Sequence, residues 1–334
     1  MRKIGIVLLC LLCWQAGRGE WTKQSTNTLA WLHDIYFFNE NKGFIAGSGG
    51  TFLETTDGGK TWTKRKNFTD DNIRQIYFSD EYTGWLLCER DVFNRGQNSI
   101  SYLMKTTDGG ASWEKTEIGD LGRTRITRIF FNQKGKGFAV GETGALFELN
   151  DGGWEKSPWP VRYKLLGGAF SDDTHGAIVG AGGSVYFTED AGNTWNAANL
   201  FGDKTARLNA VFFFNRQNGW AVGAGGKVFQ TWSAGKTWRE QNSRVTADLF
   251  DVFFANTAEG WAVGDEGLIL HTQTGGNVWV VDETKVKHKL EKILFVGKKG
   301  FAVGFGGTIL VNGAAAPVKS DPADKPQLLK RNKN

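Results

Sequence analysis

The sequence predicts an all-β fold: a seven-bladed β-propeller whose four-stranded antiparallel blades are closed by the N-terminal strand. Three observations lead to this prediction. The 334 residues include 45 glycines and 14 tryptophans, a mixture typical of short aromatic strands joined by tight turns. Two sequence phrases recur at intervals of about forty residues, which is the period of propeller blades. The fragments of repeat at the two ends of the chain also complement each other.

Residues 1–19 have the layout of a signal peptide. Two basic residues precede an apolar run over 4–14, and glycines follow at positions 17 and 19. The run is too short for a permanent membrane anchor, so we expect export and cleavage before Glu20. Neither Cys10 nor Cys13 follows a small residue, so no lipid-anchored cysteine is expected. The expected location is the periplasm, the thylakoid lumen or the extracellular space.

Seven copies of an apolar phrase mark the innermost strand of each blade. They lie at 35–38, 76–78, 129–131, 169–170, 211–214, 252–254 and 293–295. Each is followed by a strand resembling Gly219–Gly223, a glycine turn, and a third strand such as Lys227–Thr231. Apolar runs of this length separated by glycine pairs are typical of strands joined by hairpins. A fourth strand is expected after the tryptophan that ends each repeat.

The turn between the third and fourth strands carries the Asp-box pattern T-x-D-x-G-x-[TS]-W. Its aspartate can accept hydrogen bonds from turn amides, its glycine can adopt positive φ, and its tryptophan can pack between blades. The pattern decays elsewhere, with Ser233 and Thr274 in place of the aspartate. Because the aspartate can be replaced in this way, we expect the Asp-box residues to have a structural role. The Asp-box residues are Asp57, Trp62, Asp108, Trp113, Asp190 and Trp195.

The seventh copy stops after its third strand, near Val311. The missing fourth strand is supplied by Glu20–Gln24, which matches Thr61–Arg65 at the start of another fourth strand. Pairing of the two ends would close the ring and protect its strand edges. A six-bladed ring would leave both fragments unexplained. The predicted domains are therefore a signal peptide at 1–19, the propeller at 20–313 and a disordered basic tail at 314–334.

These phrases resemble those of the photosystem II assembly and stability factor family, in which G-[WF]-A-V-G and T-x-D-G-G-x-T-W recur. Here they are matched by Gly219–Gly223 and Thr55–Trp62, and the resemblance extends over about Glu20 to Gly313. It implies an exported, non-enzymatic binding protein that helps an intrinsic membrane subunit to assemble. Because propellers host unrelated activities, function must still be argued from a site.

The net charge of +5 does not indicate a nucleic-acid partner. Three basic residues lie in the leader, and the tail adds five against two acidic ones, so the remaining chain is close to neutral. Only Cys88 remains after cleavage, so the exported fold uses no disulfide. The four histidines fall in different blades without ligand spacing. We expect no metal, no cofactor and a monomer.

Polar residues at the start of the inner strands are the first candidates for a site, because these starts share one face around the central channel. They form a mixed polar ring of His33, Asp34, Arg74, Gln75, Arg128, Asn209, Asp251, Glu291 and Lys292. The second blade also carries about a dozen extra residues around 89–98, and long loops in compact repeats are often functional. A solvated loop with scattered charges is the alternative.

The family resemblance implies an arginine-rich patch that binds the partner. The candidates on the channel face are Arg74, Arg90, Arg95, Arg123, Arg125 and Arg128. The sequence therefore favours a non-catalytic exported scaffold for a protein partner. The alternatives are a secreted carbohydrate-binding propeller and a sialidase-like glycoside hydrolase. The hydrolase lacks support, because the arginine-Ile-Pro phrase of sialidases is absent and no tyrosine faces Arg74, Arg128 or Arg207 from an inner strand.

Overall fold

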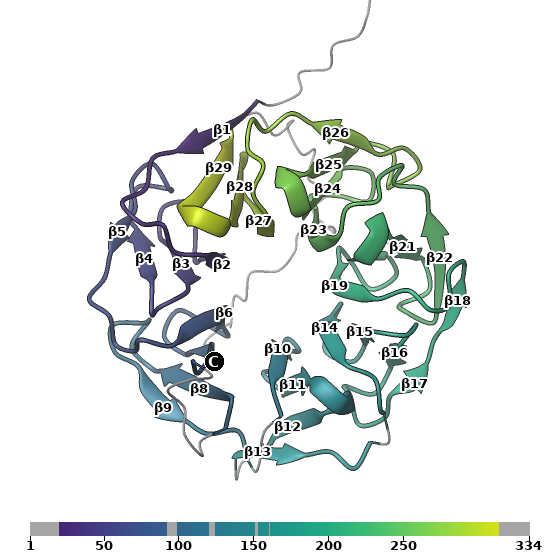
Figure 1. The fold of residues 1–334 in the computed structure, drawn as a ribbon. Coiled ribbons are helices and arrows are strands. Elements are labelled where there is room, and N and C mark those ends of the chain that lie inside the picture. Colours follow the sequence, from purple (N-terminus) through teal and green to yellow (C-terminus); the bar gives the residue numbers. More distant parts are fainter. Residues whose placement is uncertain (1–19, 92–98, 120–123, 151–152, 160, 314–334) are drawn as a thin grey trace, which may run out of the picture.

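Seven β-sheets stand around a central opening in the computed structural model (Figure 1). The structure describes residues 20–91, 99–119, 124–150, 153–159 and 161–313. The prediction of an all-β, seven-bladed propeller is confirmed. The predicted signal peptide and the predicted tail lie outside the described residues.

Each blade begins with its innermost strand and proceeds outwards. Blade 1 contains β2 (Leu32–Phe37), β3 (Gly43–Gly47), β4 (Phe52–Thr55) and β5 (Thr63–Lys64). Blade 2 contains β6 (Asn72–Phe78), β7 (Gly84–Glu89), β8 (Ser101–Thr106) and β9 (Glu114–Thr116). Blade 3 contains β10 (Ile126–Phe131), β11 (Gly137–Gly141), the 3₁₀ turn η1 (Glu142–Gly144), β12 (Leu146–Asn150) and β13 (Gly153–Lys156). Blade 4 contains β14 (Leu165–Phe170), β15 (Gly176–Gly180), β16 (Val185–Thr188) and β17 (Asn196–Ala197).

The remaining blades follow the same order. Blade 5 contains β19 (Leu208–Phe213), β20 (Gly219–Gly223), η2 (Ala224–Gly226), β21 (Val228–Thr231) and β22 (Thr237–Gln241). Blade 6 contains β23 (Leu249–Phe254), β24 (Gly260–Gly264), η3 (Asp265–Gly267), β25 (Ile269–Thr272) and β26 (Val280–Asp282). Blade 7 contains β27 (Leu290–Val296), β28 (Lys299–Gly304), η4 (Phe305–Gly307), β29 (Thr308–Asn312) and β1 (Trp21–Gln24).

The N-terminal strand closes the last blade, as predicted. β1 pairs antiparallel with β29, with Trp21 opposite Asn312 and Gln24 opposite Ile309. Trp21 is 2% exposed, and its indole Nε1 donates to Asp282 Oδ2 of blade 6 at 3.1 Å. Residues 21–24 therefore connect the last two blades, so that the outer edge of blade 7 is paired rather than open.

Blade 5 has one strand more than the repeat predicts. After the short strand β17, the segment β18 (Asn199–Phe201) crosses to the next blade and pairs parallel with β22. The backbone N–H of Asn199 also donates to the carbonyl of Lys236 at 2.9 Å. The segment thus covers an outer edge that would otherwise present unpaired backbone groups to solvent.

Aromatic side chains fill the spaces between adjacent blades. Phe254 of blade 6 stacks on Trp220 of blade 5 with ring centroids 3.5 Å apart, and Tyr77 of blade 2 stacks on Phe131 of blade 3 at 4.2 Å. Trp62 contacts Phe301 across the junction of blades 1 and 7. Each such ring buries roughly 150–250 Å², so the interfaces between blades supply much of the stability of the fold.

The Asp-box carboxylates hold their own turns. Asp57 Oδ1 accepts from Thr55 Oγ1 and from the Thr61 amide, while Asp57 Oδ2 accepts from Thr61 Oγ1 at 2.6 Å. These hydrogen bonds, led by that of the Thr61 hydroxyl, hold the pKa of Asp57 below its usual range. Asp108 and Asp190 make the same set of contacts in their turns. In the degenerate copies a hydroxyl takes over, because Ser233 Oγ accepts from the Thr237 amide at 3.0 Å.

These turns lie at the end of the blades away from the starts of the inner strands. The amide of Gly58, inside the first Asp-box, donates to the carbonyl of Asn41 in the turn that follows β2. Trp113 and Trp195 pack, like Trp62, against phenylalanines of two neighbouring blades.

Cys88 is buried in β7, and burial raises the pKa of its thiol to about 12. No helix in the described part of the chain is long and apolar enough to cross a membrane.

Candidate functional site

A β-bulge at the start of every inner strand builds the candidate site. In each blade the register between the first and second strands skips one residue, directly after a buried leucine or isoleucine. A bulge residue leaves the ladder, so its side chain is redirected. The seven bulge residues all line one pocket of about 380 Å³, here called the central pocket. They are His33, Arg74, Thr127, Leu166, Asn209, Phe250 and Glu291.

The residues that flank each bulge complete the lining. From the position before the buried leucine or isoleucine come Trp31, Arg125, Lys164, Arg207 and Lys289, and from the position after the bulge come Arg128, Asp251 and Lys292. Glu89, at the end of β7, and Ile126 also line the pocket. All seven blades therefore contribute to one site around the central opening.

The last glycine of the G-x-A-V-G phrase fixes the loop that carries these flanking residues. A Cβ at Gly223 would lie 1.9 Å from the carbonyl oxygen of Arg207, and one at Gly304 would lie 2.0 Å from that of Lys289. Only glycine permits this close approach. The same carbonyls accept hydrogen bonds from Ala224 and Phe305 at 2.9 Å. The repeat thus anchors the backbone at the pocket while leaving the side chains variable.

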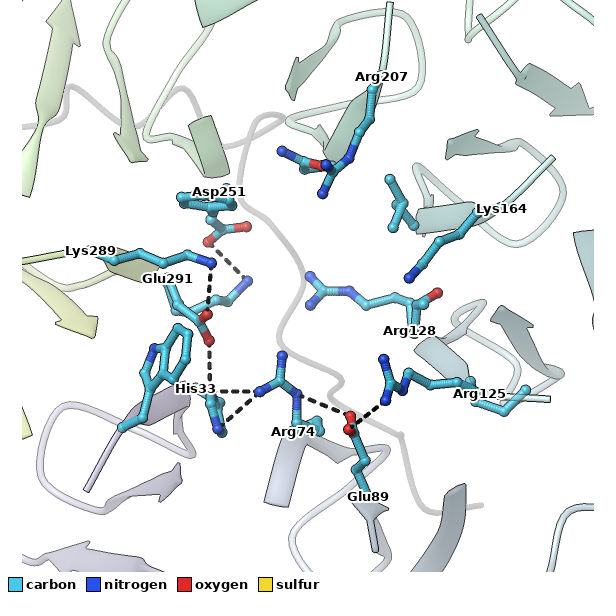
Figure 2. Close-up of a pocket in the computed structure, with 17 residues that line it drawn as sticks. His33, Arg74, Glu89, Arg125, Arg128, Lys164, Arg207, Asp251, Lys289 and Glu291 are labelled. Atoms are coloured by element: carbon cyan, nitrogen blue, oxygen red, sulfur yellow. Dashed lines mark hydrogen bonds and ion pairs between the residues drawn. The ribbon is translucent and has the colours of Figure 1, made fainter. Parts of the chain in front are cut away.

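The described lining carries seven basic side chains against three acidic ones. Most of the basic groups are paired with a neighbouring carboxylate (Figure 2). Glu89 lies 3.8 Å from Arg74 Nε and 3.2 Å from an Arg125 guanidinium nitrogen, while Lys292 Nζ is 3.0 Å from Asp251 Oδ2. The predicted mixed ring is therefore present, but with an excess of positive charge.

Arg128 and Arg207 differ from the other cations of the central pocket. Within the described ranges, neither guanidinium forms an ion pair or a hydrogen bond with another residue (Figure 2). In the figure the Arg128 guanidinium points to the middle of the pocket, across from Glu291 and Lys289. Two unpaired guanidiniums in one concave site are suited to bind carboxylate or another planar anion.

A buried hydrogen-bonded group supports the opposite side of the pocket. His33 Nδ1 lies 2.7 Å from Glu291 Oε2, and Arg74 Nη1 lies 3.0 Å from His33 Nε2. Burial lowers the pKa of His33, and Arg74 lowers it further, although Glu291 acts in the opposite direction. Burial would raise the pKa of Glu291, but His33, Arg74 and Lys289 together lower it. A neutral imidazole donates from Nδ1 to the ionised Glu291 carboxylate, and Arg74 Nη1 lies 3.1 Å from Nδ1 and 3.0 Å from Nε2.

Two residues predicted for the polar ring do not line the central pocket. Asp34 is 3% exposed and its Oδ2 accepts from the amide of Ile76 in the next blade at 2.8 Å. Gln75 bonds both the amide and the carbonyl of Ile129, again in the next blade. Because the side chain after the bulge turns back into the sheet at these positions, both residues cross-link inner strands instead.

The six candidate arginines are only partly brought together. Arg74, Arg125 and Arg128 line the central pocket, whereas Arg95 and Arg123 lie outside the described residues. Arg90 does not line it and is 6% exposed. Its guanidinium lies over the Tyr102 ring at 4.3 Å and bonds Ser99 and Glu117, so Arg90 supports blade 2 from within.

Sequence reasoning missed Trp31, Lys164, Phe250 and Lys289, and considered Arg207 only for a hydrolase. A usable signal was present: in every repeat a leucine or isoleucine precedes the inner apolar phrase, as in Trp31-Leu32-His33 and Arg207-Leu208-Asn209. The residues on either side of this buried anchor point to the pocket. Strict strand alternation would have placed both on the sheet face opposite the anchor, towards a neighbouring blade.

Comparisons with known proteins agree with this architecture. The family model described as photosynthesis system II assembly factor YCF48 matches residues 15–98, 148–244 and 235–315. The "Photosystem II assembly lipoprotein Ycf48" of Synechococcus sp. (strain CC9902) is 28% identical over 200 residues, covering 54% of this chain and 52% of that protein. The protein of the same name from Picosynechococcus sp. is 27% identical over 232 residues, which cover 56% of this chain and 67% of that protein.

One solved structure has the same overall fold. It is described as "YCF48 bound to D1 peptide", is 24% identical, and superposes with a TM-score of 0.71 over 90% of this chain and 96% of that one. The alignment with the Synechococcus relative spans only about half of that protein. The family model, however, matches well over half of the chain, in three segments distributed around the ring. The chain therefore belongs to the family of the photosynthesis system II assembly factor YCF48.

Proposed function

We propose that this protein is an exported, non-catalytic scaffold that holds an anionic segment of a polypeptide partner in the central pocket. Family membership makes an intrinsic membrane subunit of photosystem II the leading partner, since a solved relative is bound to a D1 peptide. The main support for the proposal is that Arg128 and Arg207, in a pocket lined by all seven blades, have no ion-pair or hydrogen-bond partner among the described residues.

The charge pattern of the pocket favours an anionic ligand over a neutral one. Arg74, Arg125, Lys289 and Lys292 are held by Glu89, Glu291 and Asp251, so the positions of these cations are set before a ligand arrives. Lys164 pairs with Glu142, which leaves Arg128 and Arg207 without a partner carboxylate among the described residues. A ligand carboxylate would restore local neutrality, and a preorganised guanidinium loses little entropy when it binds one.

The carboxylates of the pocket support binding without turnover. A glycoside hydrolase needs one carboxyl group that stays protonated as a general acid. Glu291 is instead held ionised by its hydrogen bond with His33, and Asp251 Oδ2 accepts from the Ile293 amide and contacts Lys292. Asp34, whose pKa is raised by burial, lies in the sheet and accepts from two backbone amides.

The domain limits and export route are part of the same proposal. Residues 1–19 direct export, residues 20–313 form the binding domain, and residues 314–334 are a basic tail without a role in binding. Both curated relatives are named assembly lipoproteins of photosystem II, which is consistent with a compartment outside the cytoplasm. The periplasm and the thylakoid lumen are the compartments in which this partner class would be met.

Fluorescence polarisation with labelled peptides tiled along the D1 sequence tests the proposal. We expect at least one acidic peptide to bind, and the double variant Arg128→Gln/Arg207→Gln to weaken it at least tenfold. Each lost charge-assisted hydrogen bond is worth about 1.5–3 kcal/mol, and 1.4 kcal/mol corresponds to a factor of ten. Added salt should also weaken binding, since the attraction is electrostatic.

Arg239→Gln provides the matched control. Arg239 is an exposed arginine on the outer strand β22, so Arg239→Gln makes the same kind of substitution once, far from the pocket. Equal affinities of wild type, control and double variant for every binding peptide would refute the assigned site. Absence of binding to the whole peptide set would refute the proposed partner.

A further inference from the structure

Two aromatic residues, Trp31 and Phe250, line one side of the central pocket, and Phe305 packs against Trp31 beside it. The three come from blades 1, 6 and 7, which are adjacent in the ring, and are here called the aromatic wall. Phe305 meets Trp31 edge to face at 5.5 Å. Lys289 Nζ lies 3.7 Å from the ring centroid of Phe250 and 5.2 Å from that of Trp31, so Lys289 contacts both rings. The cations without partners come from blades 3 and 5, outside these three blades.

The aromatic wall continues from the pocket onto the open surface. Phe305 is 46% exposed, and Leu29, two residues before Trp31, is 88% exposed. The loop that carries Leu29 is tied to the turn of Phe305, because the Gly307 amide donates to the Ala30 carbonyl and Thr26 Oγ1 donates to the Gly307 carbonyl. Exposed apolar surface grouped beside a concave site is a feature of binding sites.

The fold itself does not require aromatic residues at these positions. The turns equivalent to that of Phe305 begin with Glu142, Ala224 and Asp265. The bulge position of Phe250 is occupied in other blades by a histidine, an arginine, a threonine, a leucine, an asparagine and a glutamate. The position of Trp31 holds arginine or lysine in blades 3, 4, 5 and 7. Three departures from the repeat on three adjacent blades therefore point to a ligand rather than to folding.

We infer that the aromatic wall is an apolar subsite, and that the pocket selects peptides in which a bulky apolar side chain lies close to a carboxylate. This inference rests on the proposed function and specifies its ligand. The carboxylate would meet Arg128 and Arg207, while the apolar side chain would pack on Trp31, Phe250 and Phe305. An acidic segment without such a side chain would leave the aromatic wall in water and bind less tightly.

The test uses the D1 peptide with the highest affinity that depends on Arg128 and Arg207. Each apolar residue of that peptide is replaced by alanine, and each version is titrated against wild type, Phe305→Ala and Phe250→Asn. Alanine and asparagine occupy the equivalent positions at Ala224 and Asn209, so both variants respect the repeat. Phe201→Ala is the matched control, because Phe201 is 55% exposed on the outer strand β18. Equal melting temperatures would verify folding.

We expect one apolar position of the peptide to account for about a tenfold loss of affinity with wild type. The loss should shrink with Phe305→Ala or Phe250→Asn but not with Phe201→Ala, since a double-mutant cycle reports direct coupling. In the opposite case, a peptide binds in an arginine-dependent way and yet loses the same affinity on alanine substitution with wild type, Phe305→Ala and Phe250→Asn. That result would overturn the apolar subsite but not the proposed function. If no peptide depends on the arginines, the proposed function fails and the subsite with it.

Discussion

Closure of the ring by the N-terminal strand gives the sharpest test of the fold. Trp21 is the main contact of β1, being 2% exposed and packed against Phe295 with ring centroids 6.0 Å apart. Its Nε1 donates to Asp282 in the neighbouring blade. Trp21→Ala removes the ring system and the donor, whereas Trp21→Phe retains one aromatic ring and removes the donor with part of the ring system. Comparison of the two variants therefore shows how much stability the retained ring provides.

The expected magnitudes follow from this environment. Burial of roughly 200 Å² at about 25 cal/mol/Å² gives an upper bound of about 5 kcal/mol, and tryptophan-to-alanine changes in cores cost about 3–5 kcal/mol. For a domain of this size that corresponds to a fall in Tm of about 5 to 8 °C. Trp21→Phe leaves Asp282 without the indole donor, which should cost about 1–3 kcal/mol and about 2 to 5 °C.

Calorimetry on protein that begins at Glu20 measures these shifts, with Thr22→Ala as the control. Thr22 is exposed on the same strand, and its substitution should change Tm by no more than about 1 °C. Deletion of residues 20–24 should lower Tm by more than Trp21→Ala does, because the deletion also removes the four-residue pairing with β29. A Tm for Trp21→Ala within about 1 °C of wild type would show that β1 does not hold the ring closed.

Three further predictions concern the pocket and the leader. Burial and Arg74 lower the pKa of His33 beneath its unfolded value of about 6.5, so the unfolded chain binds the proton more readily and stability should fall as the pH drops from about 7 to 5. In His33→Asn, Tm should change less with pH over this range than in wild type. An equal pH dependence of Tm in the two proteins would contradict this prediction. Gly223→Ala should lower Tm by about 2 to 5 °C and weaken peptide binding, because its Cβ meets the Arg207 carbonyl, whereas Gly313→Ala, with open space around it, should do neither. Mass spectrometry of the exported protein should find Glu20 at the mature N-terminus, and a lipid on Cys10 or Cys13 would overturn the proposed processing.

The pairing pattern of the pocket explains why charge alone was a poor guide to its members. Arg74 and Arg125 share Glu89, which ends a strand of blade 2 and was not singled out as a pocket residue from the sequence. Arg90, only one residue further on, turns into the blade and packs on Tyr102. Neighbours in sequence thus play different parts, because successive residues of a strand point in opposite directions.

The architecture could be predicted from the sequence, since the number of blades, the Asp-box turns and the closure by residues 21–24 rest on local repeats and on end fragments that match. The turns depend on hydrogen bonds within a few residues, such as those of Asp57 with Thr55 and Thr61, and the closing strand repeats the sequence of another fourth strand. The composition of the site, in contrast, depends on contacts between blades that are far apart in the sequence. The bulges redirect one side chain per blade into a shared pocket, and His33 meets Glu291 from 258 residues away. Which cations are neutralised and which stay unpaired depends on such long-range contacts, and the forty-residue period carries no information about them.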